Sequence, residues 1–511
     1  MKKPSTNLLV LALTMVASLA MTAAAKDPPT VFLPSFAPVD QQTNFLTFLG
    51  KYIPEDPTTA KAYYKAIDPL NEKLTFTQWL VNAGFIGKES DWHPTGKQDV
   101  RTGQPAGVYG DNIINTDSRV IVINDADLGF VRNQFIRCKP SCTAKNPIIY
   151  TYLENYPVST TDPFGFPSPE EARTAILNGD ARNVGNDPAK DRIADVAFEW
   201  SPPPDGSSSD TRYGKLYAYV FHRDSATGAI TETRNWFNDP AVLSKLNSRT
   251  SVEFPPLHPI VAGEPFAPEL DARGFKQNPG VCFMCHGGTP QALTDTGKYP
   301  KQGKVSGFKF LPLDIPNLLF TSDNDPGDPL SRAAQEAQIK RYNQAVLVTH
   351  GARLNKDGVW KVPMFTDDQG VWRTTHAIET ILGWYGGAAM PSPTQNVHFV
   401  PAGWRETRNG GTAPAGSEKL YLDVVAPSCR SCHFQRGQDN DFGTLGSWNA
   451  NKSDILELVL KPECRSDDPR PGKRVMPAAR RTFDRFWLQD QDEHIKNFYG
   501  FTATSYCDSL D

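Results

Sequence analysis

The sequence lacks three features that would fix its class at once: a strong net charge, a long apolar run beyond its first residues, and a cysteine near its N-terminus. Its 511 residues carry 53 Lys and Arg against 57 Asp and Glu, a formal net charge of −4. So small a charge argues against nucleic acid or an acidic lipid surface as a partner. Beyond residue 25 no segment reaches the ~20 apolar residues that a membrane-spanning helix needs, so we expect no membrane span in the mature chain.

The first 25 residues are typical of a cleaved signal peptide. Two lysines precede the apolar run NLLVLALTMVASLAMTAAA, whose small residues end in an A-x-A site at Ala25. A membrane anchor is the alternative, but the run is short and rich in small residues. No cysteine lies in or just after this segment, which excludes a lipid anchor on a mature N-terminal cysteine. We therefore expect export to the periplasm and a mature chain that starts near Lys26.

Residues 26–265 predict an α+β domain with a mostly antiparallel sheet. Thr75 stands near the start of a predicted helix in TFTQWLVNAGF. Cys138 and Cys142 bracket a KPS turn, and in an oxidising compartment we expect a local disulfide rather than two free thiols. Strands are predicted within residues 118–138, 146–156, 192–200, 215–224 and 229–237.

This N-terminal domain contains no catalytic constellation that the sequence reveals. Its histidines stand singly among aromatic residues and prolines: His93, His222 and His258. We expect surface or packing roles for each. The sequence leaves the role of this domain open. The alternatives are covering a haem edge, docking a partner and binding a substrate.

Two further segments share one pattern, CFMCH at 282–286 and CRSCH at 429–433. Both fit C-x-x-C-H, the attachment pattern of c-type haem. Two thiols add across the two vinyl groups of one haem, and the adjacent histidine then lies under the ring and binds the iron. The motifs predict two covalently bound haem c groups, held by Cys282, Cys285, Cys429 and Cys432, with His286 and His433 as iron ligands.

Other chemistries explain the two motifs less well. A single zinc site with four thiolates would join two CxxC pairs that are much farther apart than the pairs of ordinary zinc ribbons. A redox-active dithiol is disfavoured in an exported chain. Neither explains a histidine after both pairs.

The surroundings of the second motif resemble a class I cytochrome c over about residues 412–505. A helix is predicted over 416–433, leading into CRSCH. Ser453 is expected to cap a second helix in SDILELVLK. A final helix that begins in RTFDRFW would carry Phe483, Phe486 and Trp487 against the fold. The same helix is expected to continue through Ile495 and Phe498.

The Met-Pro pair ahead of this final helix completes the resemblance. Met476 is followed by Pro477, and class I cytochromes present their distal iron ligand in this way. The resemblance implies His433 as proximal and Met476 as distal ligand of the second iron; plain core packing is the alternative for Met476. We also expect a disulfide between Cys464 and Cys507, which would tie the C-terminal tail to the methionine loop.

The first motif has a less ordinary setting, because a loop rich in proline and glycine precedes Cys282. Met390, before Pro391, is the first candidate for the distal ligand of its iron and repeats the Met-Pro of the second motif. Further candidates are His350, Met364 and His376, and an iron with no distal protein ligand is the remaining possibility. Helices are predicted over 330–349 and 375–386.

Taken together, the sequence predicts a signal peptide (1–25), the α+β domain (26–265), a first haem c domain (266–411) and a class I cytochrome c-like domain (412–511), the two haem domains being mainly α-helical. The expected function is electron transfer by an exported dihaem c-type cytochrome with a redox partner protein. One alternative is a dihaem enzyme of the cytochrome c peroxidase or haem oxygenase type with an open first iron. The other is an electron-transfer subunit of a larger oxidoreductase.

Overall fold

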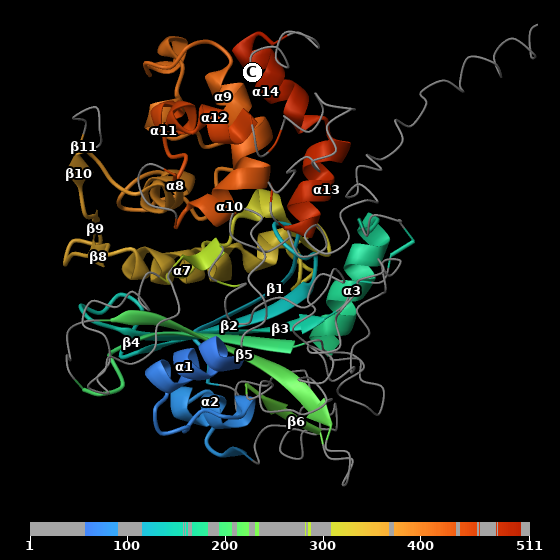
Figure 1. Cartoon of the computed structure of the whole chain (residues 1–511), viewed down its shortest axis with the longest axis vertical. Helices are drawn as coiled ribbons and strands as arrows, with labels where there is room; N and C mark the ends of the chain where they lie inside the picture. Colours follow the sequence, from blue (N-terminus) through green and yellow to red (C-terminus); the bar gives the residue numbers. More distant parts are fainter. Residues whose placement is uncertain are drawn as a thin grey trace, which may run out of the picture.

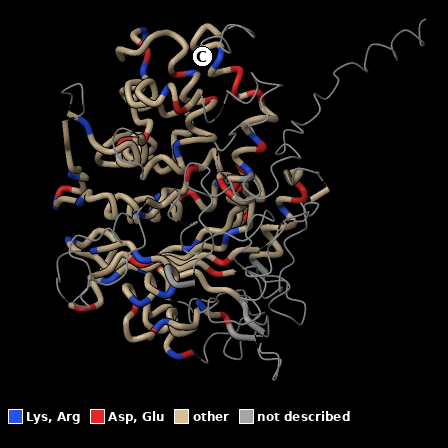
Figure 2. Tube along the Cα trace, viewed as in Figure 1, with Lys and Arg blue, Asp and Glu red and all other residues tan. Residues whose placement is uncertain are grey.

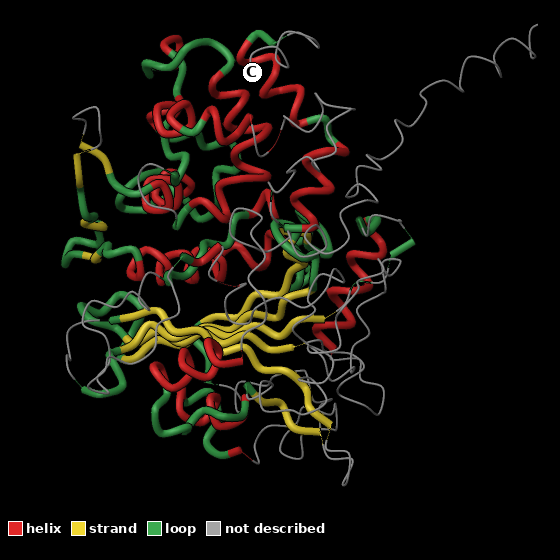
Figure 3. Tube along the Cα trace, viewed as in Figure 1, coloured by secondary structure: helices red, strands yellow, loops and turns green. Residues whose placement is uncertain are grey.

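The computed structural model describes part of the 511-residue chain. The described residues are 57–89, 115–156, 158, 160–161, 166–181, 194–206, 212–223, 230–234, 282, 285–287, 308–366, 372–435, 440–456, 459, 477 and 479–501. Strands form a central layer, α1 and α2 cover one of its faces, and most other helices lie on the opposite side (Figures 1 and 3). The fold is therefore α+β, with basic and acidic residues interspersed along the chain (Figure 2).

The central layer is a seven-stranded antiparallel sheet in the order β6-β5-β4-β3-β2-β1-β7. Six strands are neighbours in sequence as well as in space, so the predicted antiparallel sheet is confirmed. Their alternating apolar residues suit a sheet that is covered by helices. The strands are β1 (Ser118–Asn124), β2 (Val131–Lys139), β3 (Ile148–Tyr156), β4 (Ala194–Ser201), β5 (Tyr213–Arg223), β6 (Ile230–Thr233) and β7 (Leu318–Leu319).

Helices α1 (Pro57–Ile67) and α2 (Phe76–Ala83) pack on one face of the sheet. The predicted start of α2 is confirmed, because Thr75 forms a capping box with Gln78. The hydroxyls of Tyr63 and Tyr64 accept hydrogen bonds from the β5 amides of Leu216 and Ala218 at 2.9 and 3.2 Å. These bonds satisfy backbone groups of β5 that lie beyond the short strand β6.

The opposite face is covered by α7 (Arg332–Thr349), with α8 (His376–Trp384) beyond it. Both helices were predicted, and their side-chain caps are Ser331 and Thr375. The Gln335 side chain accepts from the Ile121 amide at 2.7 Å and donates to the Ile121 carbonyl at 3.0 Å. Strand β7 pairs with β1 only at Ile123 and Asn124. At Ile121 the Gln335 side-chain amide therefore takes the place of a neighbouring strand.

One apolar core joins the sheet, α1, α2, α7 and α8, and it includes residues from Ala60 to Met390. The boundary expected near residue 265 lies outside the described residues, and the segments on either side of it pack together. A second core comprises buried residues from Val400 to Ile495. Within the described residues, no helix is long and apolar enough to cross a membrane.

The helix that leads into the second motif is continuous from Ser417 to His433, as predicted. It consists of α9 (Ser417–Leu420), the π-helix η7 (Tyr421–Cys429) and α10 (Arg430–His433). Pro427 lies inside the π-helical part, where it lacks an amide to donate.

Two boundaries in the C-terminal layer differ from the prediction. Ser453 is not an N-cap: α11 (Leu445–Ala450) runs directly into α12 (Lys452–Ile455), and Asn451 alone separates them. The predicted final helix is two helices, α13 (Arg480–Leu488) and α14 (Gln491–Tyr499). Asp490 has a φ of 50°, a left-handed conformation that cannot continue an α-helix.

The remaining elements are short or peripheral. They are α3 (Pro169–Ala181), η4 (Ile315–Asn317), the hairpins β8 (Arg353–Leu354) with β9 (Trp360–Lys361) and β10 (Phe365–Thr366) with β11 (Trp372–Arg373), η5 (Ala402–Trp404) and η6 (Thr407–Asn409). Among them, η4 lies at the site described next.

Candidate functional site

The two Cys-x-x-Cys-His motifs meet at one place in the fold. The Sγ atoms of Cys285 and Cys432 are 2.7 Å apart, although 147 positions separate these residues in the chain. Cys282 and His286 of the first motif and Cys432 of the second line one cavity between the sheet and the helical layer. The tertiary structure thus unites two motifs that the sequence presents as separate sites.

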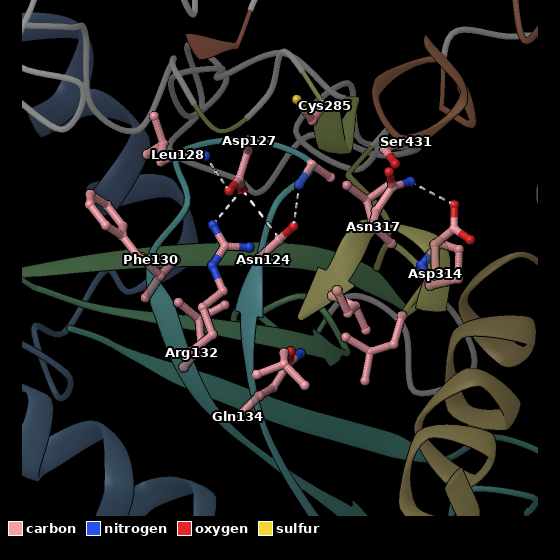
Figure 4. A pocket seen from close by; sticks show the side chains of 18 of the residues that line it. Asn124, Asp127, Leu128, Phe130, Arg132, Gln134, Cys285, Asp314, Asn317 and Ser431 are labelled. Atoms are coloured by element: carbon pink, nitrogen blue, oxygen red, sulfur yellow. Dashed lines mark hydrogen bonds and ion pairs between the residues drawn. The ribbon is translucent and has the colours of Figure 1, made fainter. Parts of the chain in front are cut away.

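The floor of this cavity is made by the sheet. Arg132 and Gln134 rise from β2, and an ion pair joins Arg132 to Asp127 in the β1–β2 turn (Figure 4). Cys285 and Ser431 lie on the far side of the cavity from Arg132 and Gln134 (Figure 4). The cavity measures about 160 Å³, below the ~300 Å³ at which ligand pockets usually begin.

The first motif's histidine is held by a carbonyl and two aromatic rings. His286 Nδ1 lies 3.0 Å from the Lys309 carbonyl oxygen, and its ring stacks on Phe198 and Phe308 with centroid distances of 5.1 and 4.7 Å. Burial, together with the nearby charge of Arg132 and against the hydrogen bond to Lys309, lowers the pKa of His286 to about 4. The imidazole is therefore neutral, with its hydrogen on Nδ1 and a free electron pair on Nε2.

A glycine makes room for this arrangement. A Cβ on Gly214 of β5 would lie 2.2 Å from the Phe308 carbonyl oxygen. Since no real Cβ approaches so closely, the segment that carries Phe308 and Lys309 can rest on β5 only because residue 214 is glycine. In the sequence, Gly214 directly precedes the predicted strand 215–224, and a glycine there does not say what approaches it.

The second motif's histidine has the same hydrogen bond in a different setting. His433 Nδ1 lies 2.6 Å from the Asn440 carbonyl oxygen, and the ring stacks on Phe442 with a centroid distance of 4.0 Å. Because a carbonyl oxygen can only accept, this bond places a hydrogen on Nδ1. Histidines that bind metal usually donate their other ring N–H in this way, which fixes both the tautomer and the ring orientation.

The second motif is also anchored by an ion pair that the sequence did not reveal. Arg430, the second residue of CRSCH, meets the Asp314 carboxylate with Nε–Oδ2 and Nη2–Oδ1 distances of 2.7 and 2.5 Å. The two side chains are 0% and 3% exposed. Burial disfavours the Arg430 charge, but the Asp314 carboxylate outweighs burial and raises the pKa of Arg430. Asp314 lines the same cavity as Cys282 and His286, so this ion pair connects the second motif to the cavity of the first motif.

The ion pair extends into a buried polar chain. The Asn317 amide donates to Asp314 at 3.0 Å and accepts from Arg485 of α13 at 2.9 Å. Arg485 also pairs with Asp125 at the end of β1, with an N–O distance of 3.3 Å. The chain therefore connects the sheet, η4 and α13 beneath the second motif.

A second chain of hydrogen bonds leaves Arg430 in the other direction. Arg430 Nη1 lies 3.3 Å from the Tyr421 hydroxyl oxygen, which lies 3.0 Å from His376 Nε2. His376 Nδ1 in turn lies 2.6 Å from the Asp441 carbonyl oxygen. His376, considered above for the first iron, is thus held beside the second motif, where its ring also meets Phe434 edge-on.

The other candidate distal ligands of the first iron lie in varied surroundings. Met390 is buried in a turn after α8, with a φ of 48°, and its carbonyl accepts from Lys340 Nζ at 2.7 Å. His350 is buried with its Nε2 3.2 Å from the Phe310 carbonyl oxygen and 2.7 Å from the Gln435 side-chain nitrogen. Met364 is 47% exposed.

The remaining predicted residues fall into two groups. Met476, Cys464 and Cys507 lie outside the described residues. Cys138 and Cys142 form the expected local disulfide, with a Cα–Cα distance of 4.9 Å.

Comparison of the chain with protein-family models, with curated proteins and with solved structures finds no match.

The two histidines are placed as iron ligands of haem usually are. The cysteine sulfurs are placed less suitably for attaching haem. Each imidazole has its Nδ1 bonded to a backbone carbonyl, as metal-binding histidines usually do. The cavity of about 160 Å³ is too small to enclose a porphyrin. The 2.7 Å between the Sγ atoms of Cys285 and Cys432 is shorter than a non-bonded sulfur contact, so the two residues could not both carry a thioether in this arrangement.

Proposed function

We propose that this chain is an exported dihaem c-type cytochrome that transfers electrons. One observation carries the proposal: both motifs have a histidine whose Nδ1 is bonded to a backbone carbonyl, and the two motifs adjoin. When bound, a c-type haem supplies an iron centre that gains and loses one electron. Localisation in the periplasm and reliance on a redox partner protein belong to the same proposal.

The chain's own residues would hold and orient the two groups. Cys282 and Cys285 attach the first haem, and Cys429 and Cys432 attach the second. The carbonyls of Lys309 and Asn440 keep the histidine hydrogens on Nδ1, as above. Because Cys285 and Cys432 are in contact, the attachment points of the two haems adjoin, which supports electron exchange between them.

Met476 remains our proposed distal ligand of the second iron and Met390 that of the first. A dihaem enzyme of the peroxidase or oxygenase type is the second candidate function. It is favoured by the surroundings of Met390, whose described contacts are with α7 and α8 rather than with His286. An iron without a distal protein ligand would bind peroxide or dioxygen.

The test is to count haem groups in the full chain expressed with the cytochrome c maturation machinery. We expect a pyridine haemochrome spectrum and an intact mass that both give two haems per chain. The double variant Cys429→Ala with Cys432→Ala should keep one haem. The matched control, Cys138→Ala with Cys142→Ala, removes a cysteine pair of similar spacing and should keep both.

Other outcomes would contradict the proposal. A chain without haem but with a Cys285–Cys432 disulfide would assign the contact between the motifs to a covalent cross-link. Electron paramagnetic resonance (EPR) of the oxidised protein then separates the two haem functions. Two low-spin signals are expected for the electron carrier, whereas one high-spin signal would favour the enzyme.

A further inference from the structure

The second cysteine of each motif reaches the same point in the fold. The 2.7 Å between the Sγ atoms of Cys285 and Cys432 is longer than the ~2.05 Å of a disulfide bond and shorter than a non-bonded sulfur contact. Cys285 and Ser431, the residue before Cys432, lie on the same side of the cavity (Figure 4). The fold therefore brings two thiols within reach of bond formation.

The segment that carries Cys285 is fixed to the sheet side of the cavity. The His286 carbonyl accepts a hydrogen bond from the Lys309 amide at 3.0 Å, and His286 Nδ1 is bonded to the Lys309 carbonyl. The same imidazole ring stacks on Phe198 of β4 and on Phe308. Because the residue next to Cys285 is held through both its backbone and its side chain, the sheet layer determines where Cys285 lies.

Cys432 is fixed to the helical layer by a separate set of contacts. It lies in α10, one residue before His433, whose Nδ1 is bonded to the Asn440 carbonyl. Two residues before Cys432, Arg430 is held by Asp314 in the buried ion pair. The two sulfurs are thus positioned by different layers, and a bond between them would fix how these layers stack.

The first cysteine of each motif is less suited to forming a disulfide. Desolvation raises the pKa of the Cys282 and Cys429 thiols to about 12, so both are almost entirely protonated near neutral pH. Thiol–disulfide exchange requires a thiolate. A disulfide within a motif would need one of these two thiols, whereas a disulfide between Cys285 and Cys432 needs neither.

We propose that Cys285 and Cys432 form a disulfide in the haem-free chain and that this bond joins the sheet layer to the helical layer. Two S–H bonds break and one S–S bond forms, so the pair loses two electrons and two protons. The oxidant is another disulfide, such as glutathione disulfide. One thiolate attacks it and releases one thiol, and the second thiolate attacks the resulting mixed disulfide and releases the other, with the two protons passing to the released thiolates.

The proposal does not depend on haem binding. A Cys285–Cys432 disulfide and two thioethers at these residues exclude each other, because both would use the same two sulfurs. The disulfide is therefore expected only in chains to which haem is not attached at these positions.

The experiment is a peptide map of the full chain, purified from cells that lack the cytochrome c maturation machinery and treated with glutathione disulfide. Remaining thiols are alkylated with iodoacetamide before digestion, without prior reduction. Trypsin cleaves after Arg430 and so separates Cys429 from Cys432. We expect peptide 277–298, which contains the first motif, to be linked to peptide 431–436, and Cys429 to be alkylated. Reduction should separate the linked peptides.

Serine variants identify the two sulfurs. Cys285→Ser and Cys432→Ser should each abolish the linked peptides. Cys282→Ser and Cys429→Ser are the matched controls, since each removes the other thiol of the same motif, and both should keep the link. The bond joins residues 147 positions apart, and closing a long loop restricts the unfolded chain strongly. Cys432→Ser should therefore lower the unfolding temperature of the haem-free chain by roughly 5 °C relative to Cys429→Ser.

Three results would overturn the proposal. They are alkylation of both Cys285 and Cys432 after treatment with glutathione disulfide, a disulfide within a motif in place of the one between motifs, and a haem-free chain without a cooperative unfolding transition. If a serine variant fails to fold, the wild-type peptide map still decides. The haem count of the chain made with the maturation machinery tests the proposed function separately, since the peptide map uses chains made without it.

Discussion

The two Cys-x-x-Cys-His motifs present the same five-residue pattern, and the fold holds them by different means. The first histidine lies on the sheet, beside the rings of Phe198 and Phe308. The second ends a long buried helix and is fixed by the Arg430–Asp314 ion pair. What the two share is the bond from histidine Nδ1 to a backbone carbonyl, so this bond, rather than the surrounding packing, is the common requirement.

The largest effect should come from breaking the ion pair of the second motif. Asp314→Ala leaves the Arg430 charge buried without its carboxylate, which typically costs about 3–5 kcal/mol in the free energy of unfolding. Urea unfolding of the purified protein measures this loss. Asp423→Ala, in the exposed pair with Lys419, is the control and should cost about 0–1 kcal/mol. Equal losses in the two variants would mean that the buried pair is not a special anchor.

A smaller effect concerns pH and the histidine between the motifs. Burial, with the nearby Lys309 charge, lowers the pKa of His350 to about 3, against about 6.5 in the unfolded chain. As the pH falls below 6.5, His350 therefore binds a proton in the unfolded state but stays neutral in the folded state. Stability should decline by about 1.4 kcal/mol per pH unit between pH 6 and pH 4 for this residue.

The variant His350→Gln tests that contribution. Glutamine does not titrate, so the slope of unfolding free energy against pH should flatten by the same amount. His398→Gln is the control, because His398 lies in an exposed turn. If both variants kept the wild-type slope, other groups would be responsible for the acid sensitivity.

The smallest predicted effect separates the two packing environments. Phe198→Leu removes one of the two rings that stack on His286, and Phe442→Leu removes the ring that stacks on His433. Each should cost about 1 kcal/mol, because leucine keeps most of the apolar volume of the ring. EPR of the oxidised protein gives the sharper readout. Each variant should alter one of the two low-spin signals, and a variant that altered both would mean that the two surroundings are not independent.

Local sequence patterns predicted much of the secondary structure. Alternating apolar residues predicted the main strands, and Thr75 predicted the start of α2 through its cap. The prediction was wrong at Asn451 and Asp490, where the chain turns between helices. These turns carry no glycine or proline, and they form because the flanking helices each bury their own apolar face in the second core.

The sequence by itself determined which thiols and which imidazole each motif brings together, because their spacing over five residues is local. Only the tertiary structure decided that Cys285 meets Cys432, that Arg430 meets Asp314 and that Tyr421 meets His376. These partners are 147, 116 and 45 positions apart. Periodicity specifies which face of an element is buried, but the partner across that face depends on how whole layers stack, and no local pattern encodes that stacking.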